Sequence, residues 1–581
     1  MSEASTREDL IDPAIERAGW HLDDSTQVGV EIPVEGHNAE PWNGVTDYVF
    51  FRENGEVLAV VEAKKTTHQP RLAQQQTEHY ITEIEKHQSF RPFAFMTNGI
   101  DIYFMDNVSA PRLVKGFFSR DDLERLLMLR AKHQSLKSTP ANKSIVNRDY
   151  QLEAVKRIGE AFEQQRKRKS LLVMATGTGK TRTAMAIVDI FIRTNQAQHI
   201  LFVADRDALV EQALNDGFEK HISTEPCIRL RSTNLEEAKT NRLLTVTLQT
   251  LSNVFEQFTP GFFDLIIFDE VHRSIFNKWD EVLEYFDALM IGLTATPASF
   301  IDRNTFIKFD CFDGTPTFLY TYEEAIEDGY LVDFRLYRAE THFQSDGIRG
   351  YELAEEDRNA LIEQGLDPDD IDFEGTELEK TVTNRDTLRR QWQEIMEVCL
   401  KDQSGQLPGK TIVFAMTQDH AVRLLETFEE MYPQWRDMAA VITHKSEYRG
   451  QAIKKFKKED MPRIAISVNM LETGVDVPEV VNLVFMTPVK SQIKMQQMIG
   501  RGTRVHEACL FPDRLPDGHK QEFLIIDFWE NDFSKQAEEA PASSLPVLVS
   551  LFNTRLKRLE KPLKDQQSDE FTKLGTVPRE Q

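Results

Sequence analysis

The sequence predicts an α/β fold, and three observations support this prediction. Short apolar runs alternate with helical patterns over most of the chain, an order that is typical of parallel sheets covered by helices. A glycine-containing turn follows one apolar run and opens a helical pattern, as in phosphate-binding sheets. The 581 residues, 40% of them hydrophobic, are enough for several packed cores. We therefore expect about three or four α/β domains.

Changes in pattern divide the chain into three blocks and a tail. The first block has a hairpin at its centre, whereas the second and third alternate apolar strands with helices. An acidic, loop-rich stretch at 354–376 is predicted to be an exposed insertion, and the apolar spacing at 547–559 is typical of an amphipathic helix. The predicted domain boundaries are 1–140, 141–335, 336–535 and 536–581.

A candidate phosphate-binding loop occupies residues 174–181, Met-Ala-Thr-Gly-Thr-Gly-Lys-Thr, after the apolar run at 170–173. Its backbone N–H groups are placed to cradle phosphates where a buried strand turns into a helix. We expect Lys180 to bind the outer phosphates of ATP and Thr181 to supply an oxygen to Mg²⁺. Met174 replaces the first glycine of the full pattern. The expected loop residues are Thr176, Gly177, Thr178 and Gly179.

A second motif lies about 90 residues further on, where an apolar run ends in Asp-Glu-Val-His. Asp269 is predicted to reach the same Mg²⁺ from the end of a buried strand. Glu270 is then placed to orient the attacking water. Together the two motifs indicate a nucleotide-hydrolysing enzyme that uses ATP and Mg²⁺.

More polar residues are expected where other strands end. Arg206 follows an apolar run, as does the segment that contains Thr250, and open α/β sheets bind ligands at the carboxyl ends of their strands. Further along, a strand is expected to close at residues 473–478. Arg501 and Arg504 stand three residues apart, and we expect them on one face of a helix start.

The hairpin of the first block carries a second set of chemical groups. Asn54-Gly55 is a tight-turn signal, so antiparallel pairing should bring Glu62 back toward Asp47. Lys64 shares one strand face with Glu62. Two carboxylates there can hold Mg²⁺ and activate water, with Lys64 as a positive group near the nucleophile. The residues at i and i+4 of a following helix are Gln76 and Tyr80.

Composition limits the class of protein. The formal net charge is −25, so nucleic acid would have to bind in local basic grooves. The chain has no apolar run of transmembrane length, and its polar start has no signal core. We therefore expect a cytoplasmic protein without a membrane partner. Its four cysteines have no metal-ligand spacing and are expected to be reduced.

The motifs over about 145–535 resemble, in kind and order, those of superfamily 2 helicases and translocases. This resemblance implies two RecA-like domains that close on ATP, with Arg501 and Arg504 stabilising charge on the transferred phosphoryl group. It also implies that Gln151 reads the adenine edge and that Asp476 lies near the ribose. The residues implied to contact DNA are Arg206, Thr250 and Thr473.

The first block resembles the PD-(D/E)xK nuclease core, although Val45-Thr46-Asp47 lacks the usual proline. A restriction-endonuclease-like domain ahead of such a motor is similar to the restriction subunit of type I restriction-modification enzymes. That resemblance implies a double-stranded DNA translocase and Mg²⁺-dependent endonuclease whose methylase and specificity partners are separate subunits. Such subunits usually continue into a helical assembly region, of which the 536–581 tail would be a truncated part.

Two other interpretations stay open at this point. One is a stand-alone superfamily 2 helicase or defence ATPase whose first block binds DNA without cutting it. It predicts unwinding of a tailed duplex and no effect of Asp47→Ala on DNA integrity. The other is a scaffold protein in which ATP only switches a conformation, and it predicts ATP turnover that is indifferent to added DNA.

Overall fold

The structure is a computed structural model of the chain. It describes residues 3–34, 44–270, 278–295, 303–339, 348–349, 372–373, 385–442, 449–468 and 476–533. Thr473, nearly all of the 354–376 insertion and the 536–581 tail with its predicted helix lie outside the described residues.

The chain forms two compact units, which are described separately. The first comprises Met1–Leu172, Thr181–Thr294 and Asp302–Phe318. The second comprises Val173–Lys180, Ala295–Ile301 and Leu319–Gln581. The predicted domain boundaries remain predictions.

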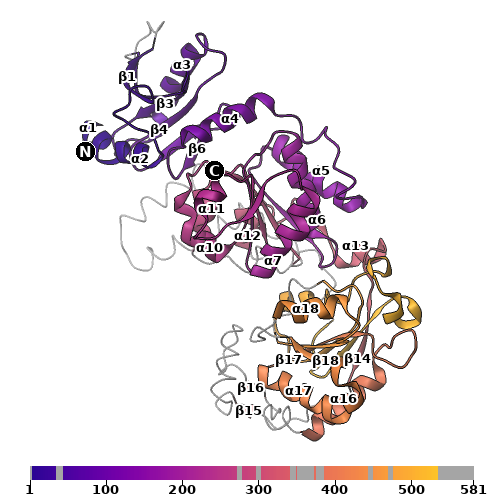
Figure 1. Cartoon of the computed structure of the whole chain (residues 1–581). Coiled ribbons are helices and arrows are strands. Elements are labelled where there is room, and N and C mark those ends of the chain that lie inside the picture. Colours follow the sequence, from indigo (N-terminus) through magenta and orange to yellow (C-terminus); the bar gives the residue numbers. More distant parts are fainter. Residues whose placement is uncertain are drawn as a thin grey trace, which may run out of the picture. The chain divides into compact units, whose positions relative to one another are not determined.

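A six-stranded sheet forms the N-terminal part of the first unit, with its strands in sequential order (Figure 1). β2 pairs with β1 and β3 in antiparallel fashion, whereas β3 and β4 are parallel. The predicted hairpin is therefore confirmed as β2 and β3, with Gly55 at φ +83° in its turn. The strands are β1 (Val28–Pro33), β2 (Val45–Phe51), β3 (Val57–Ala63), β4 (Phe93–Thr97), β5 (Ile102–Met105) and β6 (Arg112–Val114).

Helices cover both faces of this sheet. On one face Trp20 stacks on Phe50 with ring centroids 4.3 Å apart, in a core shared with α2 and α4. On the other face Ile81 of α3 packs against Val60 and its neighbours. The helical segments are α1 (Glu3–Thr6), η1 (Arg7–Ile11), α2 (Asp12–Arg17), η2 (Pro70–Ala73), α3 (Gln74–Glu85) and α4 (Arg120–Lys132).

A seven-stranded sheet follows, in the order β13-β7-β12-β11-β8-β10-β9. The strands β12, β11, β8, β10 and β9 pair in parallel, as the alternating pattern predicts. The strands are β7 (Lys169–Met174), β8 (Ile200–Ala204), β9 (Cys227–Arg229), β10 (Leu243–Thr247), β11 (Leu265–Asp269), β12 (Leu289–Thr294) and β13 (Phe318–Tyr320).

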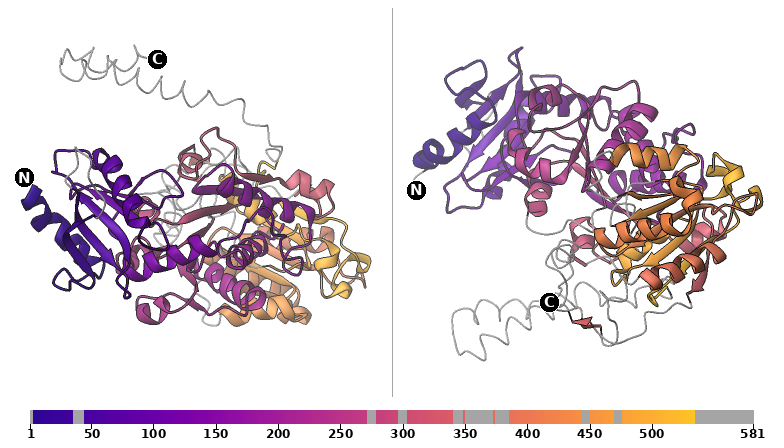
Figure 2. Two further views of the ribbon diagram at one scale, coloured as in Figure 1. Left: turned by 90° about the horizontal axis from the view of Figure 1, so that it is seen from above. Right: turned by 60° about the horizontal axis from the view of Figure 1, so that its bottom comes forward.

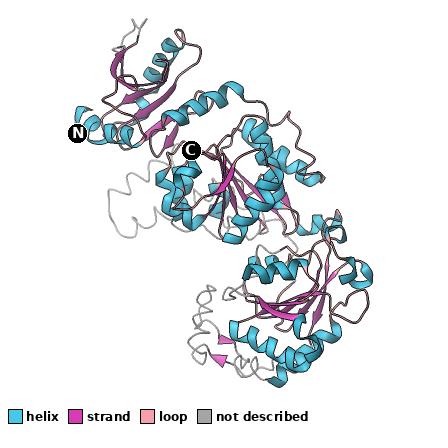
Figure 3. Cartoon of the chain, viewed as in Figure 1, coloured by secondary structure: helices cyan, strands magenta, loops and turns pink. Residues whose placement is uncertain are grey.

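Helices lie on both sides of the seven-stranded sheet, with α5 and α6 opposite α10 and α11 (Figures 1 and 3). The apolar faces of α5 and α6 share one core with β8 and β11. The helical segments are α5 (Asp149–Glu163), α6 (Lys180–Arg193), α7 (Asp207–Gln212), η3 (Ala213–Phe218), α8 (Glu219–His221), α9 (Leu235–Lys239), α10 (Leu248–Val254), η4 (Phe255–Gln257), α11 (Lys278–Tyr285), α12 (Arg303–Lys308) and α13 (Tyr322–Glu327).

The second unit contains a six-stranded sheet that is parallel throughout, in the order β14-β21-β20-β17-β19-β18. A separate antiparallel pair is formed by β15 (Ile348–Arg349) and β16 (Asp372–Phe373). The sheet strands are β14 (Phe334–Arg338), β17 (Lys410–Ala415), β18 (Ala439–Ile442), β19 (Ile464–Ser467), β20 (Val480–Met486) and β21 (Phe523–Asp527).

This parallel sheet is also covered on both faces (Figure 2). α16 and α17 pack on one face through Trp392 and Phe428, whose ring centroids lie 4.9 Å apart. α18 and α19 contribute Phe456 and Met498 to the core of the other face. The helical segments are α16 (Arg385–Val398), α17 (Gln418–Met431), η8 (Pro433–Met438), α18 (Arg449–Lys458), α19 (Gln492–Ile499), η9 (His506–Ala508), η10 (Pro512–Arg514) and η11 (Pro516–Gly518).

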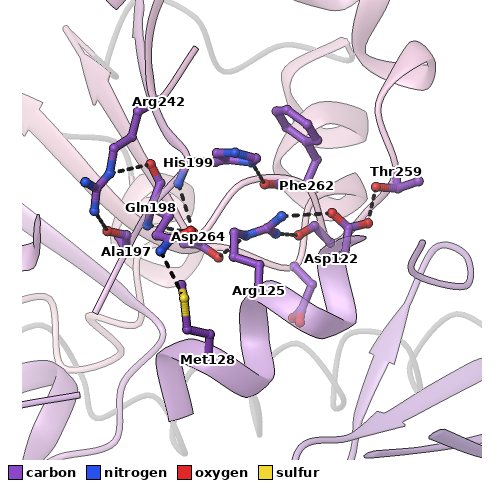
Figure 4. A network of polar contacts seen from close by, with 12 residues as sticks. Asp122, Arg125, Met128, Ala197, Gln198, His199, Arg242, Thr259, Phe262 and Asp264 are labelled. Carbon is purple, nitrogen blue, oxygen red and sulfur yellow. Dashed lines mark hydrogen bonds and ion pairs between the residues drawn. The ribbon is translucent and has the colours of Figure 1, made fainter. Parts of the chain in front are cut away.

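Within the first unit, α4 joins the N-terminal sheet to the seven-stranded sheet through a buried polar network (Figure 4). Arg125 lies 3.1 Å from both Asp122 and Asp264, and it donates to the Gly261 carbonyl. Asp264 also accepts the backbone N–H groups of Gln198 and His199 at 2.8 and 2.9 Å. His199 immediately precedes β8, so this network connects α4 directly to the core strands.

The α/β fold class is confirmed by these sheets. Among the described residues, no helix is both long enough and apolar enough to cross a membrane. All four cysteines are free thiols, as expected from their spacing.

Candidate functional site

The predicted phosphate loop links the end of β7 at Met174 to the start of α6 at Lys180. Gly177 and Gly179 adopt positive φ angles of +95° and +89°, which side chains other than glycine rarely tolerate. Thr178 is fully buried and donates its hydroxyl to the Ala175 carbonyl at 2.7 Å. The loop thus has the strand-turn-helix geometry that presents backbone N–H groups to an anion.

Two features of the loop explain its sequence. A Cβ atom on Gly177 would lie 2.8 Å from the hydroxyl of Thr503 and 3.0 Å from Leu331, so this position has no room for a side chain. Met174, by contrast, is the last residue of β7 and is fully buried. The first glycine of the full pattern therefore falls in a strand core, where an apolar side chain packs.

Asp269 and Glu270 stand at the carboxyl end of β11, in the same sheet as β7. Their exposed fractions are only 5% and 8%. The Glu270 N–H donates to Asp269 Oδ1 at 3.1 Å, and Glu270 has φ +54°. An acidic residue in this strained conformation is held by its surroundings, and such residues are often found at functional sites.

Arg504 contacts the phosphate loop within the second unit. Its guanidinium donates to the Gly177 carbonyl and pairs with Asp476, with Nη2 2.6 Å from Oδ2. Burial would raise the pKa of Asp476, but the charge of Arg504 outweighs it and holds that pKa below its ordinary value. Arg504 and Asp476, two of the predicted nucleotide contacts, are therefore in direct contact with each other.

The predicted helical placement of the two arginines is wrong. α19 ends at Ile499, so Arg501 and Arg504 follow the helix instead of sharing one of its faces. The chain leaves the helix at Gly500, and Arg504 forms an isolated bridge with Leu331. Arg501 Nε donates back to the Gln497 carbonyl at 3.2 Å.

Three further predicted motor residues lie among the described residues of the first unit. Gln151 is buried in the first turn of α5, with 2% of its surface exposed. Arg206 follows β8, with Nε 3.6 Å from Asp205. Thr250 lies in α10, and its side-chain oxygen is 2.9 Å from Thr247, which caps that helix. Thr250 is therefore also part of the N-terminal cap of α10.

The five predicted nuclease residues form one connected cluster in the N-terminal domain. Asp47 Oδ2 accepts the N–H of Ala63 at 2.7 Å, which joins it to the strand end that carries Glu62. Lys64 Nζ lies 3.8 Å from Glu62 Oε2 and 3.4 Å from Gln76 Oε1. Gln76 Nε2 donates to the Tyr80 hydroxyl at 3.1 Å.

Burial shapes the electrostatics of this cluster. Glu62 is 1% exposed and Tyr80 is fully buried. Burial raises the pKa of Tyr80, and the charge of Glu62 raises it further while the hydrogen bond from Gln76 opposes the shift. Tyr80 therefore remains a protonated phenol, able to donate a hydrogen bond.

The donor sets suit Mg²⁺, which takes oxygen ligands and usually binds through one or two carboxylates together with waters and substrate phosphates. Asp47 and Glu62 supply two carboxylates on adjacent strands. Asp269, the last residue of β11, supplies a carboxylate, and Thr181, in the first turn of α6, supplies a hydroxyl. Neither set is an all-protein cage, which fits a cation that arrives with phosphate.

Some contact residues of these sites were not found from the sequence. Thr503, between the two arginines, contacts the Thr176 carbonyl through its hydroxyl at 3.5 Å. Arg7 lies 3.6 Å from Asp47. Arg7 comes from a distant segment without a motif, whereas the position of Thr503 beside Arg504 was an available signal.

Comparisons with known proteins identify relatives for most of the chain. The family model "Type III restriction enzyme, res subunit" matches residues 144–299, and "Helicase conserved C-terminal domain" matches residues 391–506. The type I restriction enzyme EcoAI endonuclease subunit of Escherichia coli is 29% identical over 572 residues, which cover 91% of this chain and 66% of that protein.

A second relative and a solved structure are also similar to this chain. The EcoKI endonuclease subunit of Escherichia coli K12 is 28% identical over 91% of this chain and 52% of its own length. A solved fragment described as an HsdR subunit of a type I restriction enzyme from Vibrio vulnificus covers 91% of this chain and 93% of that chain, at 24% identity and a TM-score of 0.49.

This chain spans about two thirds and about half of the length of the two curated relatives. Its α/β architecture matches the predicted combination of an N-terminal domain and two RecA-like parallel-sheet domains. Over most of its length the chain is therefore similar to the endonuclease subunits of type I restriction enzymes, and two of its segments match restriction-subunit and helicase family models.

Proposed function

We propose that the chain is an ATP-dependent double-stranded DNA translocase and Mg²⁺-dependent endonuclease, the motor and cleavage subunit of a type I restriction-modification complex. The observation that carries this proposal is the presence of two separate constellations on one chain. One is the phosphate loop with its contact to Arg504, and the other is the Asp47–Glu62–Lys64–Gln76–Tyr80 cluster. A scaffold protein would need neither the second cluster nor an arginine at the phosphate loop.

In the proposed motor, the N–H groups of residues 176–179 bind the phosphates of ATP and Lys180 binds the outer ones. Bound Mg²⁺, held by Thr181 and Asp269, would neutralise charge on the phosphates. Glu270 orients the attacking water, and its low exposure keeps the carboxylate away from bulk solvent.

Arginines complete the proposed ATP site. Arg501 and Arg504 stabilise the charge that develops on the transferred phosphoryl group. The pairing of Arg504 with Asp476 fixes its guanidinium beside the loop carbonyl of Gly177. Gln151 reads the adenine edge and Asp476 lies near the ribose. In each cycle of hydrolysis, the DNA contacts of Arg206, Thr250 and Thr473 would then form and break in turn.

In the proposed nuclease, Asp47 and Glu62 hold the metal and Lys64 supports the nucleophile. Bound Mg²⁺ would activate water and stabilise charge on the cleaved phosphodiester. Gln76 orients Lys64 from the helix, while Tyr80 orients Gln76. Methylase and specificity subunits are the proposed partners, because the similar relatives are named as endonuclease subunits of type I restriction enzymes.

The test measures ATP hydrolysis with and without long duplex DNA in Mg²⁺, while the same DNA is run on a gel. Lys180→Ala should abolish DNA-stimulated turnover, because the outer phosphates lose their cation. Lys156→Ala is the matched control, since Lys156 is exposed on α5. Asp47→Ala and Glu62→Ala should each abolish DNA cleavage and leave ATP turnover intact, with the exposed Glu78→Ala on α3 as their control.

The reactions are repeated with a methylase and specificity complex. Turnover that ignores DNA in both preparations would contradict the motor and favour the scaffold interpretation. DNA cleavage that survives Asp47→Ala and Glu62→Ala would contradict the nuclease. Unwinding of a tailed duplex with intact DNA in every reaction would favour the stand-alone helicase.

A further inference from the structure

A cation from the N-terminal helical segment reaches the nuclease cluster. Arg7, the first residue of η1, places Nη1 3.6 Å from Asp47 Oδ1 and 3.2 Å from Glu31 Oε1. Its side chain is 17% exposed and that of Asp47 is 20% exposed. The contact joins residues 40 positions apart in the chain, so it depends on how the helical segment docks on the sheet.

Arg7 is held in place from its other side. Its Nε donates to the Tyr48 hydroxyl at 3.2 Å, and that hydroxyl donates to Asp12 Oδ1 at 2.5 Å. The guanidinium carbon lies 4.8 Å from the centroid of the Tyr48 ring, within cation–π range. The guanidinium is thus oriented by a hydrogen-bond chain and a ring contact, which leaves Nη1 directed at the two carboxylates.

Arg7 bridges carboxylates from two neighbouring strands. Val30 pairs with Tyr48 and Ile32 with Thr46, so Glu31 and Asp47 each lie between these paired positions, and the Glu31 side chain is 70% exposed. Like charges that lie close together on neighbouring strands repel. Arg7 lies within 4 Å of both carboxylates and offsets that repulsion.

Asp47 is consequently fixed through both of its oxygens. Oδ2 accepts the Ala63 N–H at 2.7 Å, and Oδ1 faces Arg7. Carboxylates that bind metals are commonly oriented by such partners, and removal of a partner typically weakens metal binding by about 10- to 100-fold. We propose that Arg7 is a positioning residue of the nuclease site, which holds the Asp47 carboxylate in the orientation that binds the divalent cation.

This inference rests on the proposed nuclease function, so its test follows metal binding instead of cleavage. Mn²⁺ is titrated into the full chain without nucleotide or DNA, and free Mn²⁺ is measured by electron paramagnetic resonance. Arg7→Ala should weaken binding at the nuclease site by about 10-fold or more. Arg17→Ala, an exposed arginine of α2, should bind Mn²⁺ like the wild type.

Two further variants test whether the orientation of the Arg7 guanidinium matters beyond its positive charge, and whether a loss of binding reflects misfolding. Arg7→Lys keeps the positive charge but lacks the fork that reaches Tyr48 and Asp47 together, so it should bind as weakly as Arg7→Ala. Tyr48→Phe keeps the ring under Arg7 and removes the hydroxyl that orients it, so it should weaken binding by a smaller factor. Tyr48→Phe keeps the inference testable should Arg7→Ala fail to fold.

The results separate a failure of the proposed role of Arg7 from a failure of the proposed metal site. Unchanged or tighter Mn²⁺ binding by Arg7→Ala and Tyr48→Phe would overturn the role of Arg7, as would wild-type binding by Arg7→Lys. Asp47→Ala and Glu62→Ala must both lose the site. If they retain it, the metal site itself is wrong and the role of Arg7 falls with it. If they lose it and the Arg7 variants do not, only the positioning role is wrong.

Discussion

At the residue scale, the first unit balances its buried charges with matched partners. Arg125 of α4 contacts Asp122, Asp264 and the Gly261 carbonyl, and Asp264 in turn holds two backbone N–H groups (Figure 4). A buried ion network of this kind is costly to interrupt, because removal of one member leaves a desolvated charge without its partner. The attachment of α4 to the seven-stranded sheet therefore depends on Arg125.

The replacement Arg125→Met should lower the free energy of unfolding of the first unit by about 3–5 kcal/mol. Methionine fills much of the arginine's volume, so the loss reports on charge and hydrogen bonds more than on packing. The measurement is urea unfolding followed by circular dichroism. Arg157→Met, at an arginine whose side chain is 54% exposed on α5, should change stability by less than about 0.5 kcal/mol. Equal losses of unfolding free energy in Arg125→Met and Arg157→Met would show that the network does not stabilise the first unit.

At the element scale, the phosphate loop depends on backbone conformation. Gly177→Ala adds a Cβ at a position with φ +95° that lies 2.8 Å from the Thr503 hydroxyl. ATP turnover should fall by about ten-fold, which corresponds to about 1.4 kcal/mol. Gly55→Ala is the matched control, because Gly55 has φ +83° with nothing within 4 Å of the added Cβ. A turnover loss of the same size in Gly55→Ala would assign the effect to overall stability.

Local elements were predictable from the sequence because their signals are local. Asn54-Gly55 encodes the hairpin that aligns Asp47 with the end of β3, and the glycines of the phosphate loop encode its turn. By contrast, the spacing of Arg501 and Arg504 suggested a helix, and the chain departs from helical structure at Gly500. Spacing fixes which residues can share a face only after the element type is known.

Contacts between distant segments were not predictable by the same reasoning. Arg7 reaches Asp47 across 40 residues, and Arg125 reaches Asp264 across 139. Neither arginine stands in a motif, and in a chain with 69 basic residues each resembles an ordinary surface charge. Only the docking of η1 and α4 on their sheets distinguishes them.

At the scale of the whole molecule, paired buried carboxylates should make the protein sensitive to acid. Burial would raise the pKa of Asp287, but the charges of Arg168 and Arg112 hold it below its ordinary value. Arg112 and Arg168 lie 2.7 and 3.0 Å from Asp287. A carboxylate with a lowered folded pKa contributes stability that is fully present above about pH 4 and is lost as the pH falls through that pKa.

Asp287→Asn should therefore be less stable than the wild type near neutral pH, and this difference should shrink as the pH falls below about 4. Urea unfolding at several pH values measures both quantities. Asp216→Asn, at an exposed aspartate, should differ from the wild type by less than about 0.5 kcal/mol throughout. A difference between Asp287→Asn and the wild type that is the same at every pH would contradict the linkage.

If ATP hydrolysis moves this chain along duplex DNA as proposed, the chain should displace a triplex-forming oligonucleotide from a linear duplex. The chain is assayed with Mg²⁺ and ATP, alone and with a methylase and specificity complex. We predict ATP-dependent displacement that disappears in Lys180→Ala and persists in Asp47→Ala. ATP turnover without displacement in both preparations would show that hydrolysis does not move the chain along DNA.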